Sequence, residues 1–349
     1  MTTIPKTGRS TPCTDHTVPP YRAPGWLPGG HAQTIYPRFL PLDPLPYRRE
    51  RWESPDGDFI DLDWNTASMP SANDDPVVVL FHGLEGSSQS HYAKALMQAL
   101  RAIGRCGVVV HFRGCSGELN RLPRAYHSGD SDEIDWILHR FKAIYPDRPL
   151  YAVGVSLGGN ALLKWLGERE SAASGILLAA AAVSCPFDMS ACGHHLAHGF
   201  NRIYTQHFLR TLKHFADEKL RHHPGLFDER RMRSAGTLYE FDDIVTAPLH
   251  GFASAADYWR RASSKPWLGG IRVPTLLINA RNDPFMPDGV LPEKQQISSA
   301  VELEYTCEGG HVGFVTAPFP GCLDWLPQRL LHFFIHGKTA AADHLERPQ

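Results

Sequence analysis

The 349-residue sequence lacks any apolar run long enough to cross a bilayer. Its longest apolar stretch, 175–183, includes four alanines and is far shorter than the roughly 20 residues that a transmembrane helix needs. The first twenty residues are polar and rich in threonine and proline, without the apolar segment of a secretory signal. We therefore expect a cytoplasmic protein with no integral membrane segment.

An excess of positive charge is also missing. Lysine and arginine together number 35, and aspartate and glutamate number 37, which leaves a formal net charge of -2. A protein that binds nucleic acid is usually far more basic, so we expect no nucleic-acid partner. The 7 cysteines include no CxxC pair, and we interpret them as mostly buried thiols of a reducing compartment.

Short β-branched runs alternate with amphipathic helical stretches through the first half of the chain. The expected strands lie at 48–53, 59–64, 76–81, 107–111, 150–155 and 175–183, and the expected helices at 90–103, 131–145 and 160–169. The run at 76–81 is apolar throughout, which is typical of a strand buried on both faces. This alternation predicts an α/β fold with a mostly parallel central sheet flanked by helices.

The alternation stops at Cys185-Pro186 and resumes near residue 271. Strands are expected again at 273–280 and 301–307, followed by an apolar helix at 323–335. The residues between, 186–270, show helical stretches and many aromatic residues but no strong strand. Connections this long usually carry function, so we interpret the segment as a helical cap, or lid, inserted between two strands of one sheet.

The chain is therefore expected to form one large domain with three parts. An irregular, proline-rich arm occupies residues 1–47. The α/β core comprises residues 48–185 and 271–340, and the helical cap comprises residues 186–270. A chain of this length buries about 75% of its unfolded surface, so neither a disulfide nor a metal is required for stability.

Ser156 is the strongest candidate for a catalytic nucleophile. It lies in Gly154-Val155-Ser156-Leu157-Gly158, directly after an expected strand and directly before an expected helix. This is the Gly-x-Ser-x-Gly nucleophile elbow, a sharp turn that exposes the serine at its tip. No other serine of the chain has these flanking residues.

A serine hydroxyl needs a base, and the base needs an orienting acid. In proteins with this elbow the chain order is serine, acid, histidine. Asp283 follows the expected strand 273–280, and His311 follows the expected strand 301–307 in a glycine-rich loop. Both lie at the carboxyl ends of their strands, the edge of a parallel sheet where ligands bind. Asp288 is a nearby alternative for the acid.

Backbone N–H groups are the expected donors to the oxyanion of a tetrahedral intermediate. Leu157 follows the nucleophile and supplies one donor. Leu84, in the glycine-rich loop after the early buried strand, is the expected source of the other. Three further residues are candidate substrate contacts: His82 at the start of this loop, and Tyr204 and Phe208 in the insertion.

Longer strings extend the pattern beyond the elbow. They are 29–35 (GGHAQTI), 81–87 (FHGLEGS), 111–121 (HFRGCSGELNR), 126–129 (YHSG) and 153–160 (VGVSLGGN). Through them the chain resembles the YheT-like branch of the α/β-hydrolases over about residues 25–335. The resemblance implies an α/β-hydrolase fold and hydrolysis of carboxylic esters, with lipid-like acyl esters handled by some relatives. It also places the catalytic serine, aspartate and histidine on Ser156, Asp283 and His311.

One departure from that family is Gly29-Gly30, where many members have Asn-Gly. The change touches no catalytic role. The sequence itself assigns no role to His31 or to the rest of the 29–35 segment.

A histidine-rich stretch in the insertion has the spacing of a metal site. His194 and His198 stand four residues apart, as on a zinc-binding helix. The general-base glutamate of the His-Glu-x-x-His motif is replaced by His195. A polar face of the cap is the better interpretation, and we expect no metal.

Two other sequence patterns could be functional, but each also has a purely structural interpretation. His127 and Asp132 have the spacing of an acyltransferase string, but they overlap the start of an expected helix, and we favour a helix cap. The basic, glycine-rich loop 113–121 either lines the site or pairs with acids such as Glu118.

The sequence thus predicts a serine hydrolase that cleaves small-molecule acyl esters through an acyl-enzyme, without cofactor or metal. An acyltransferase or thioesterase would use the same triad and would differ only in the acceptor. A catalytically silent scaffold that binds a ligand or partner is a third interpretation, and the intact triad argues against it. The acyl chain length and the oligomeric state are not set by the sequence.

Overall fold

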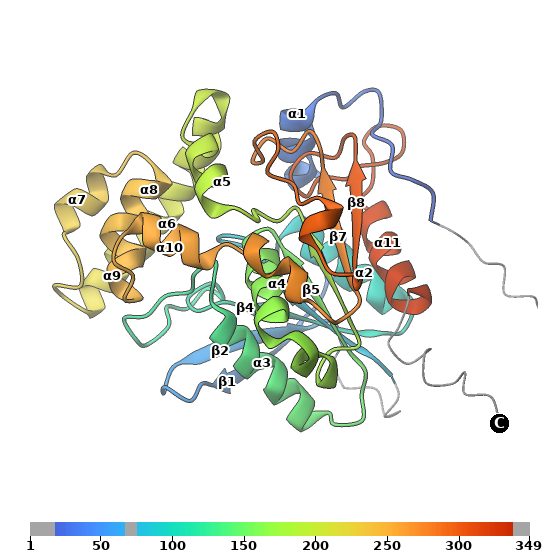
Figure 1. Ribbon diagram of the computed structural model, residues 1–349, viewed down its shortest axis with the longest axis horizontal. Helices are drawn as coiled ribbons and strands as arrows, with labels where there is room; N and C mark the ends of the chain where they lie inside the picture. The colour runs from blue at the N-terminus through green and yellow to red at the C-terminus, as the bar shows by residue number, and fades with distance from the viewer. Residues whose placement is uncertain (1–17, 67–74, 338–349) are drawn as a thin grey trace, which may run out of the picture.

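The computed structural model describes residues 18–66 and 75–337, which build an eight-stranded sheet (Figure 1). The strand order is β1-β2-β4-β3-β5-β6-β7-β8. The strands are β1 (Arg48–Glu53), β2 (Phe59–Trp64), β3 (Val77–Phe81), β4 (Cys106–His111), β5 (Leu150–Val155), β6 (Ala179–Val183), β7 (Thr275–Ala280) and β8 (Val301–Thr306). β2 runs antiparallel to both of its neighbours, and the other pairs are parallel. The predicted α/β class with a mostly parallel sheet is confirmed.

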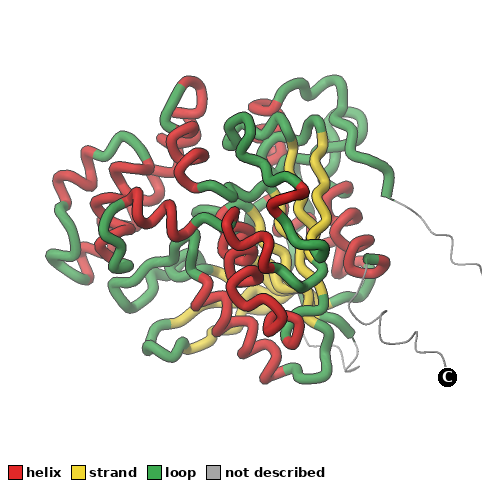
Figure 2. Tube along the Cα trace, viewed as in Figure 1, coloured by secondary structure: helices red, strands yellow, loops and turns green. Residues whose placement is uncertain are grey.

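Helices cover both faces of the sheet, so that three layers result (Figure 2). One face carries α2 (His91–Ala102) and α11 (Trp325–His336), and the other carries α3 (Ser131–Ile144) and α4 (Leu157–Arg169). In β3, Val77, Val79 and Phe81 pack with α3 and α4. Val78 and Leu80 pack with α2 and α11. A strand covered on both faces needs apolar residues at every position, which explains the uninterrupted run in the sequence.

Two element boundaries differ from the prediction for identifiable reasons. α4 begins at Leu157 rather than at 160, because Ser156 alone makes the turn from β5 and the helix starts at once. β6 begins at Ala179 rather than at 175, because the N–H groups of Ile176 and Leu177 still bond back to Ala173 of the 3-10 helix η2 (Glu170–Gly175).

A short helix stands where the sequence predicts irregular chain. α1 (Gly30–Ile35) is followed by the 3-10 turn η1 (Tyr36–Phe39). Six residues are too few to show a helical hydrophobic period, and such a short helix depends on tertiary contacts for its stability. Residues 1–17 of the predicted arm and 338–340 of the predicted core lie outside the described residues.

Residues 186–270 connect β6 to β7 and form helices and turns without a strand. They gather beside the sheet, on the left of Figure 1. The helices are α5 (Met189–Leu196), α6 (Arg202–His222), α7 (Glu229–Ser234), α8 (Leu238–Phe241), α9 (Ala247–Leu249) and α10 (Ala255–Ala262). A π-helical segment, η4 (Asp242–Thr246), joins α8 to α9. The 3-10 helices are η3 (Gly199–Asn201) and η5 (Lys265–Gly270) in the insertion and η6 (Lys294–Gln296) before β8. Across 18–66 and 75–337, no helix combines the length and apolarity needed to cross a bilayer.

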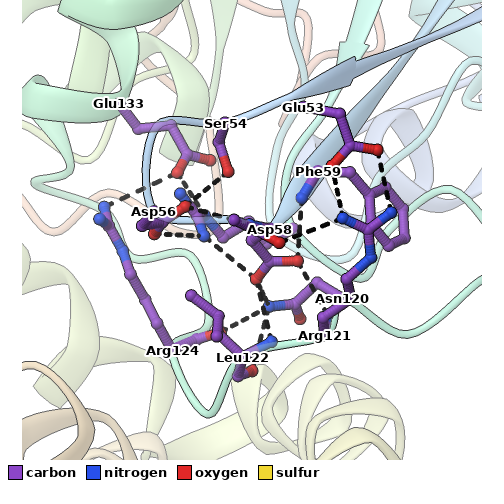
Figure 3. Close-up of polar contacts among 12 residues, drawn as sticks. Glu53, Ser54, Asp56, Asp58, Phe59, Asn120, Arg121, Leu122, Arg124 and Glu133 are labelled. Carbon is purple, nitrogen blue, oxygen red and sulfur yellow. Dashed lines mark hydrogen bonds and ion pairs between the residues drawn. The ribbon is translucent and has the colours of Figure 1, made fainter.

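A buried carboxylate anchors the loop that follows β4 (Figure 3). Asp58 lies between β1 and β2, and its side chain is fully buried. Its Oδ1 accepts hydrogen bonds from the N–H groups of Phe59 (2.9 Å) and Arg121 (2.8 Å). Its Oδ2 accepts from Asn120 Nδ2 (2.6 Å) and from the N–H of Leu122 (3.2 Å). Burial opposes ionisation, but these hydrogen bonds hold the pKa of Asp58 below its usual value.

Arginines of the same region also pair with acids. Arg113 is buried and donates to Glu133 (2.5 Å) and to Asp58 (3.1 Å). At the surface, Glu118 accepts from Arg51 of β1 (2.7 Å). Of the two interpretations that the sequence leaves open for this loop, the contacts support ion pairing within the fold rather than a lining of the active site.

The loop after β4 also holds the insertion. Lys219 of α6 is buried and donates to the main-chain oxygens of Asn120 (3.0 Å) and Leu122. Burial lowers the pKa of Lys219 to about 8. One ammonium group therefore joins the insertion to a loop that Asp58 fixes from the other side.

Replacing Asp58 by Asn should lower the free energy of unfolding by about 3 kcal/mol, because an amide NH₂ would face N–H donors and Arg113 would lose a buried partner. The matched control is Glu118→Gln, an exposed carboxylate on the same loop, for which we expect a loss below about 1 kcal/mol. Guanidinium denaturation measures both variants. Equal small losses would show that Asp58 anchors nothing.

Candidate active site

Ser156 occupies a strained turn between β5 and α4. Its backbone has φ 53° and ψ −119°, a left-handed conformation that a residue with a side chain rarely adopts. A Cβ at Gly154 would collide with the backbone of Gly159, and a Cβ at Gly158 would collide with the carbonyl oxygen of His82. Only glycine fits at these two positions, so the chain can turn sharply and place the serine at the start of a helix.

The structure brings Ser156, His311 and Asp283 together. His311 Nε2 lies 3.0 Å from Ser156 Oγ, and His311 Nδ1 lies 2.8 Å from Asp283 Oδ2. The Asp283 side chain is fully buried, whereas the His311 side chain is 11% exposed. The Asp283 carboxylate accepts a hydrogen bond from Nδ1–H in this arrangement, so Nε2 carries no proton and can accept the serine proton.

The acid is held by its own turn. Asp283 Oδ1 accepts a hydrogen bond from the N–H of Phe285 (2.8 Å), so both carboxylate oxygens are engaged. The ring of Phe285 stacks on the His311 ring at a centroid distance of 3.9 Å and fixes the plane of the imidazole. Asp288, the alternative acid, is exposed and makes no contact with His311 among the described residues.

The loop after β3 packs directly on the serine. A Cβ added to Gly83 would lie 3.2 Å from the Cβ of Ser156. Within the described residues, no hydrogen bond uses the N–H of Leu84 or of Leu157. Two free N–H groups on either side of the serine are what an oxyanion requires.

Two tyrosines that the sequence analysis missed hold this loop. Tyr92 accepts a hydrogen bond from the N–H of Gly83 (2.9 Å), and Tyr126 accepts one from the N–H of Glu85 (2.8 Å). Tyr126 also donates to Glu85 Oε1 (2.7 Å) and so supports Glu85 in a backbone conformation with φ 54°. Leu84 lies between the two fixed amides. The string 126–129 was visible in the sequence, but nothing in it shows that its tyrosine reaches residue 85.

The prediction that His82 contacts substrate is wrong. The side chain is completely buried. Its Nδ1 donates to the carbonyl oxygen of Gly83 (2.7 Å), and its Nε2 accepts from the N–H of Phe112 (3.1 Å). Burial lowers the pKa of His82 to about 3, which keeps the ring neutral. Both ring nitrogens of His82 thus bond to backbone groups of the fold, and neither is left to bind a ligand.

A largely apolar cavity opens beside the loop that follows β3. Its empty space, including the opening to solvent, is about 810 Å³. Leu84 and Leu157 line it, as do Phe215, Phe227 and Phe241 of the insertion. The cavity therefore reaches from the proposed oxyanion donors into the helices of 186–270.

Tyr204 and Phe208, the two aromatic residues predicted to contact substrate, do not line this cavity. Their rings pack on Phe285, at centroid distances of 4.8 and 5.9 Å. Tyr204 OH also lies 3.0 Å from His31 Nδ1. Both residues thus pack on the ring that stacks on His311, whereas other phenylalanines of the insertion line the cavity. Contact of Tyr204 and Phe208 with substrate stays a prediction.

The remaining histidine patterns have structural explanations. His198 Nδ1 bonds to the main-chain oxygen of His194 (2.7 Å), and the His194 ring packs edge-on against Trp259. In the described part of the chain, no group of three or more His, Cys, Asp or Glu side chains is arranged to hold a metal. Asp130, next to the acyltransferase-like string, accepts from the N–H of Glu133 and caps α3, as the sequence favoured.

The family comparison agrees with the fold. The family model described as "alpha/beta hydrolase fold" matches residues 76–318. The solved structure of Est1E from Butyrivibrio proteoclasticus with bound ferulic acid covers 81% of this chain and 97% of its own, with a TM-score of 0.51 and 14% sequence identity. At that identity the likeness concerns the fold alone.

Two relatives are similar over most of the chain. "Putative esterase YheT" of Escherichia coli (strain K12) is 41% identical over 304 residues, which are 86% of this chain and 88% of that protein. "Phospholipase ABHD3" of Homo sapiens is 31% identical over 305 residues, which are 84% of this chain and 73% of that protein. The chain therefore belongs to the α/β-hydrolase fold family and, within it, to the YheT-like esterases.

Proposed function

We propose that the protein hydrolyses carboxylic acyl esters through an acyl-enzyme formed on Ser156. The observation that carries the proposal is the unbroken contact from Asp283 Oδ2 through His311 to Ser156 Oγ, over distances of 2.8 and 3.0 Å. Relatives named esterase and phospholipase support the same class of reaction.

In the first half of the proposed cycle, Ser156 Oγ attacks the ester carbonyl carbon and passes its proton to His311 Nε2. Asp283 fixes the histidine tautomer and stabilises the imidazolium. The carbonyl oxygen becomes an oxyanion, to which the N–H groups of Leu84 and Leu157 donate. Collapse of this intermediate expels the alcohol, which takes the proton from Nε2, and leaves the acyl group on the serine.

Water completes the cycle. His311 Nε2 takes a proton from a water molecule as its oxygen attacks the acyl carbonyl carbon. The second tetrahedral intermediate collapses, the proton returns to Ser156 Oγ, and the carboxylic acid leaves. Neither a metal nor a cofactor takes part in the proposed cycle.

We assign the acyl chain to the cavity beside the loop after β3, which contains Leu84. We interpret residues 186–270 as the cap that shapes this cavity. An ester carbonyl bound near Leu84 and Leu157 would direct its acyl chain along a wall that both leucines share with Phe227. Phenylalanine and leucine side chains favour a hydrocarbon chain over a charged group. A lipid-like acyl ester is therefore the substrate class that we propose.

Replacing Ser156 by Ala should abolish ester hydrolysis and labelling by a fluorophosphonate probe, with a loss on the order of 10⁴-fold or more in kcat. Ser171→Ala, at an exposed serine on η2, should keep wild-type turnover and labelling. Nitrophenyl esters and the probe report the two activities. Substantial turnover by the Ser156→Ala variant would show that Ser156 is not the nucleophile.

Replacing Asp283 by Asn should lower kcat by roughly 10⁴-fold, because the amide donates to Nδ1 and favours the wrong tautomer. Asp288→Asn is the matched control on the same turn, and its exposed side chain should make it nearly silent. Steady-state kinetics on one short ester compares them. The opposite ranking would make Asp288 the acid.

Replacing Phe227 by Ala should enlarge the cavity and shift the preferred acyl length upward. Each methylene in an apolar pocket is worth about 1–3 kcal/mol, so the ratio of kcat/KM between long and short esters should change by roughly 10-fold or more. Phe208→Ala removes a half-buried phenylalanine of the same insertion that does not line the cavity. Its profile across C2 to C16 esters should keep the wild-type shape. If the profiles of both variants keep the wild-type shape, the cavity does not select the acyl chain.

A further inference from the structure

The loop that carries His311 has no strand or helix to hold it, and side chains take that role. Four consecutive backbone N–H groups each donate to a side-chain oxygen from elsewhere in the fold. The pairs are Gly309 with Gln33 Oε1 (2.8 Å), Gly310 with Asn282 Oδ1 (3.0 Å), His311 with Thr34 Oγ1 (2.9 Å) and Val312 with Ser184 Oγ (3.1 Å). Two of the four acceptors belong to α1, the short helix near the start of the chain, which Figure 1 places next to the ends of β7 and β8.

Thr34 bonds to the backbone of His311 itself. Its hydroxyl proton is directed to the carbonyl oxygen of Gly30 (2.7 Å), so a lone pair of Oγ1 faces the N–H of His311. The side chain of a β-branched residue in a helix has little rotational freedom. The position of the His311 backbone is therefore tied to one turn of α1.

Gln33 joins the acid loop to the histidine loop. Its side chain is completely buried. Oε1 accepts from Asn282 Nδ2 (2.9 Å), next to Asp283, and from the N–H of Gly309. Nε2 donates to the carbonyl oxygen of Leu27 (2.9 Å) and to Glu308 Oε1 (3.2 Å). One amide thus sets the distance between the loops that carry the acid and the base.

The backbones of α1 and these loops touch directly. A Cβ at Gly30 would collide with the carbonyl oxygen of Asn282, and a Cβ at Gly313 would collide with the carbonyl oxygen of Gln33. No side chain fits between them. A displacement of α1 must therefore displace both loops.

We propose that α1 is a positioning element of the active site. Its Thr34 and Gln33 hold His311 within hydrogen-bonding distance of both Asp283 and Ser156. The inference rests on the proposed function, because the placement of His311 affects turnover only if His311 is the base. Neither residue is a catalytic residue, since both act through the loop. A displacement of about 1 Å in a reacting group costs roughly 10²-fold in rate, so loss of these bonds should appear in kcat.

The test compares Thr34→Val with Thr34→Ser. Valine has the shape of threonine but no acceptor for the His311 N–H, whereas serine keeps the hydroxyl. We expect kcat on a short soluble ester to fall by roughly 10- to 100-fold in the valine variant, with KM changed by less than about twofold. The serine variant should retain kcat within about threefold of wild type.

A second buried threonine controls for stability. Thr275 starts β7, at the end of the strand opposite to the one that Asp283 follows. Among the described residues its hydroxyl bonds only to the backbone of Val273 (2.8 Å), and it is buried. Thr275→Val should lower Tm as Thr34→Val does and should leave kcat unchanged. Equal kcat losses in both valine variants at equal Tm loss would overturn the inference, because general destabilisation would then explain them.

A double-mutant cycle separates positioning from a structural role. If Thr34 acts by aligning His311 with Asp283, then Thr34→Val should cost less than about threefold in an Asp283→Asn background, measured as the rate of fluorophosphonate labelling. The same full penalty in both backgrounds would contradict the proposal. Gln33→Met, which removes both polar ends of the bridge at similar length, should show the same lack of additivity with Asp283→Asn.

The outcomes distinguish this inference from the proposed function. Loss of turnover in Ser156→Ala together with wild-type kcat in Thr34→Val would overturn the role of α1 alone. Retained turnover in Ser156→Ala would overturn the proposed function and, with it, the reason to position His311.

Discussion

The hydrogen bond between Ser156 Oγ and His311 Nε2 joins loops that leave the sheet from strands that are not neighbours. β5 and β8 are separated by β6 and β7, so their ends lie about 14 Å apart at about 4.8 Å per strand. The loop after β8 must fold back over the end of β7, which Asp283 follows, to bring His311 to Ser156. The geometry of the site therefore depends on the conformation of the loop that spans this distance.

The loop that spans this distance has a strained backbone. Gly309 and Gly310 have φ 140° and 60°, which glycine tolerates. Val312 and Phe314 have φ 57° and 43°, which costs residues with side chains about 1–2 kcal/mol each. Such a conformation persists only where the surroundings determine it. Here both side chains are buried, and four successive amides from 309 to 312 are bound by side chains.

The sequence predicted what is local and missed what joins distant segments. Gly154 and Gly158 mark the elbow because a turn of this kind leaves its signature within five residues, and buried parallel strands are apolar without interruption. Gln33 reaches across 276 positions to Gly309, and no periodicity or spacing in a sequence encodes such a contact. The surroundings of Phe208 illustrate a related limit: an aromatic residue on a helix faces either a cavity or a neighbouring ring, and only the packing of α6, which sets Phe208 against Phe285, decides which.

The two sides of Ser156 are built from different parts of the chain. Leu84 and Leu157 border the apolar cavity, whose wall also includes phenylalanines of the insertion. On the other side, Phe285 stacks on the His311 ring and also packs against Tyr204 of α6, while His31 of α1 bonds to the same tyrosine. The short helix α1 therefore contacts both the loop that carries His311 and α6 of the insertion. Because the cavity wall and this contact are separate, substitutions in the wall can alter the acyl group that fits without moving the base.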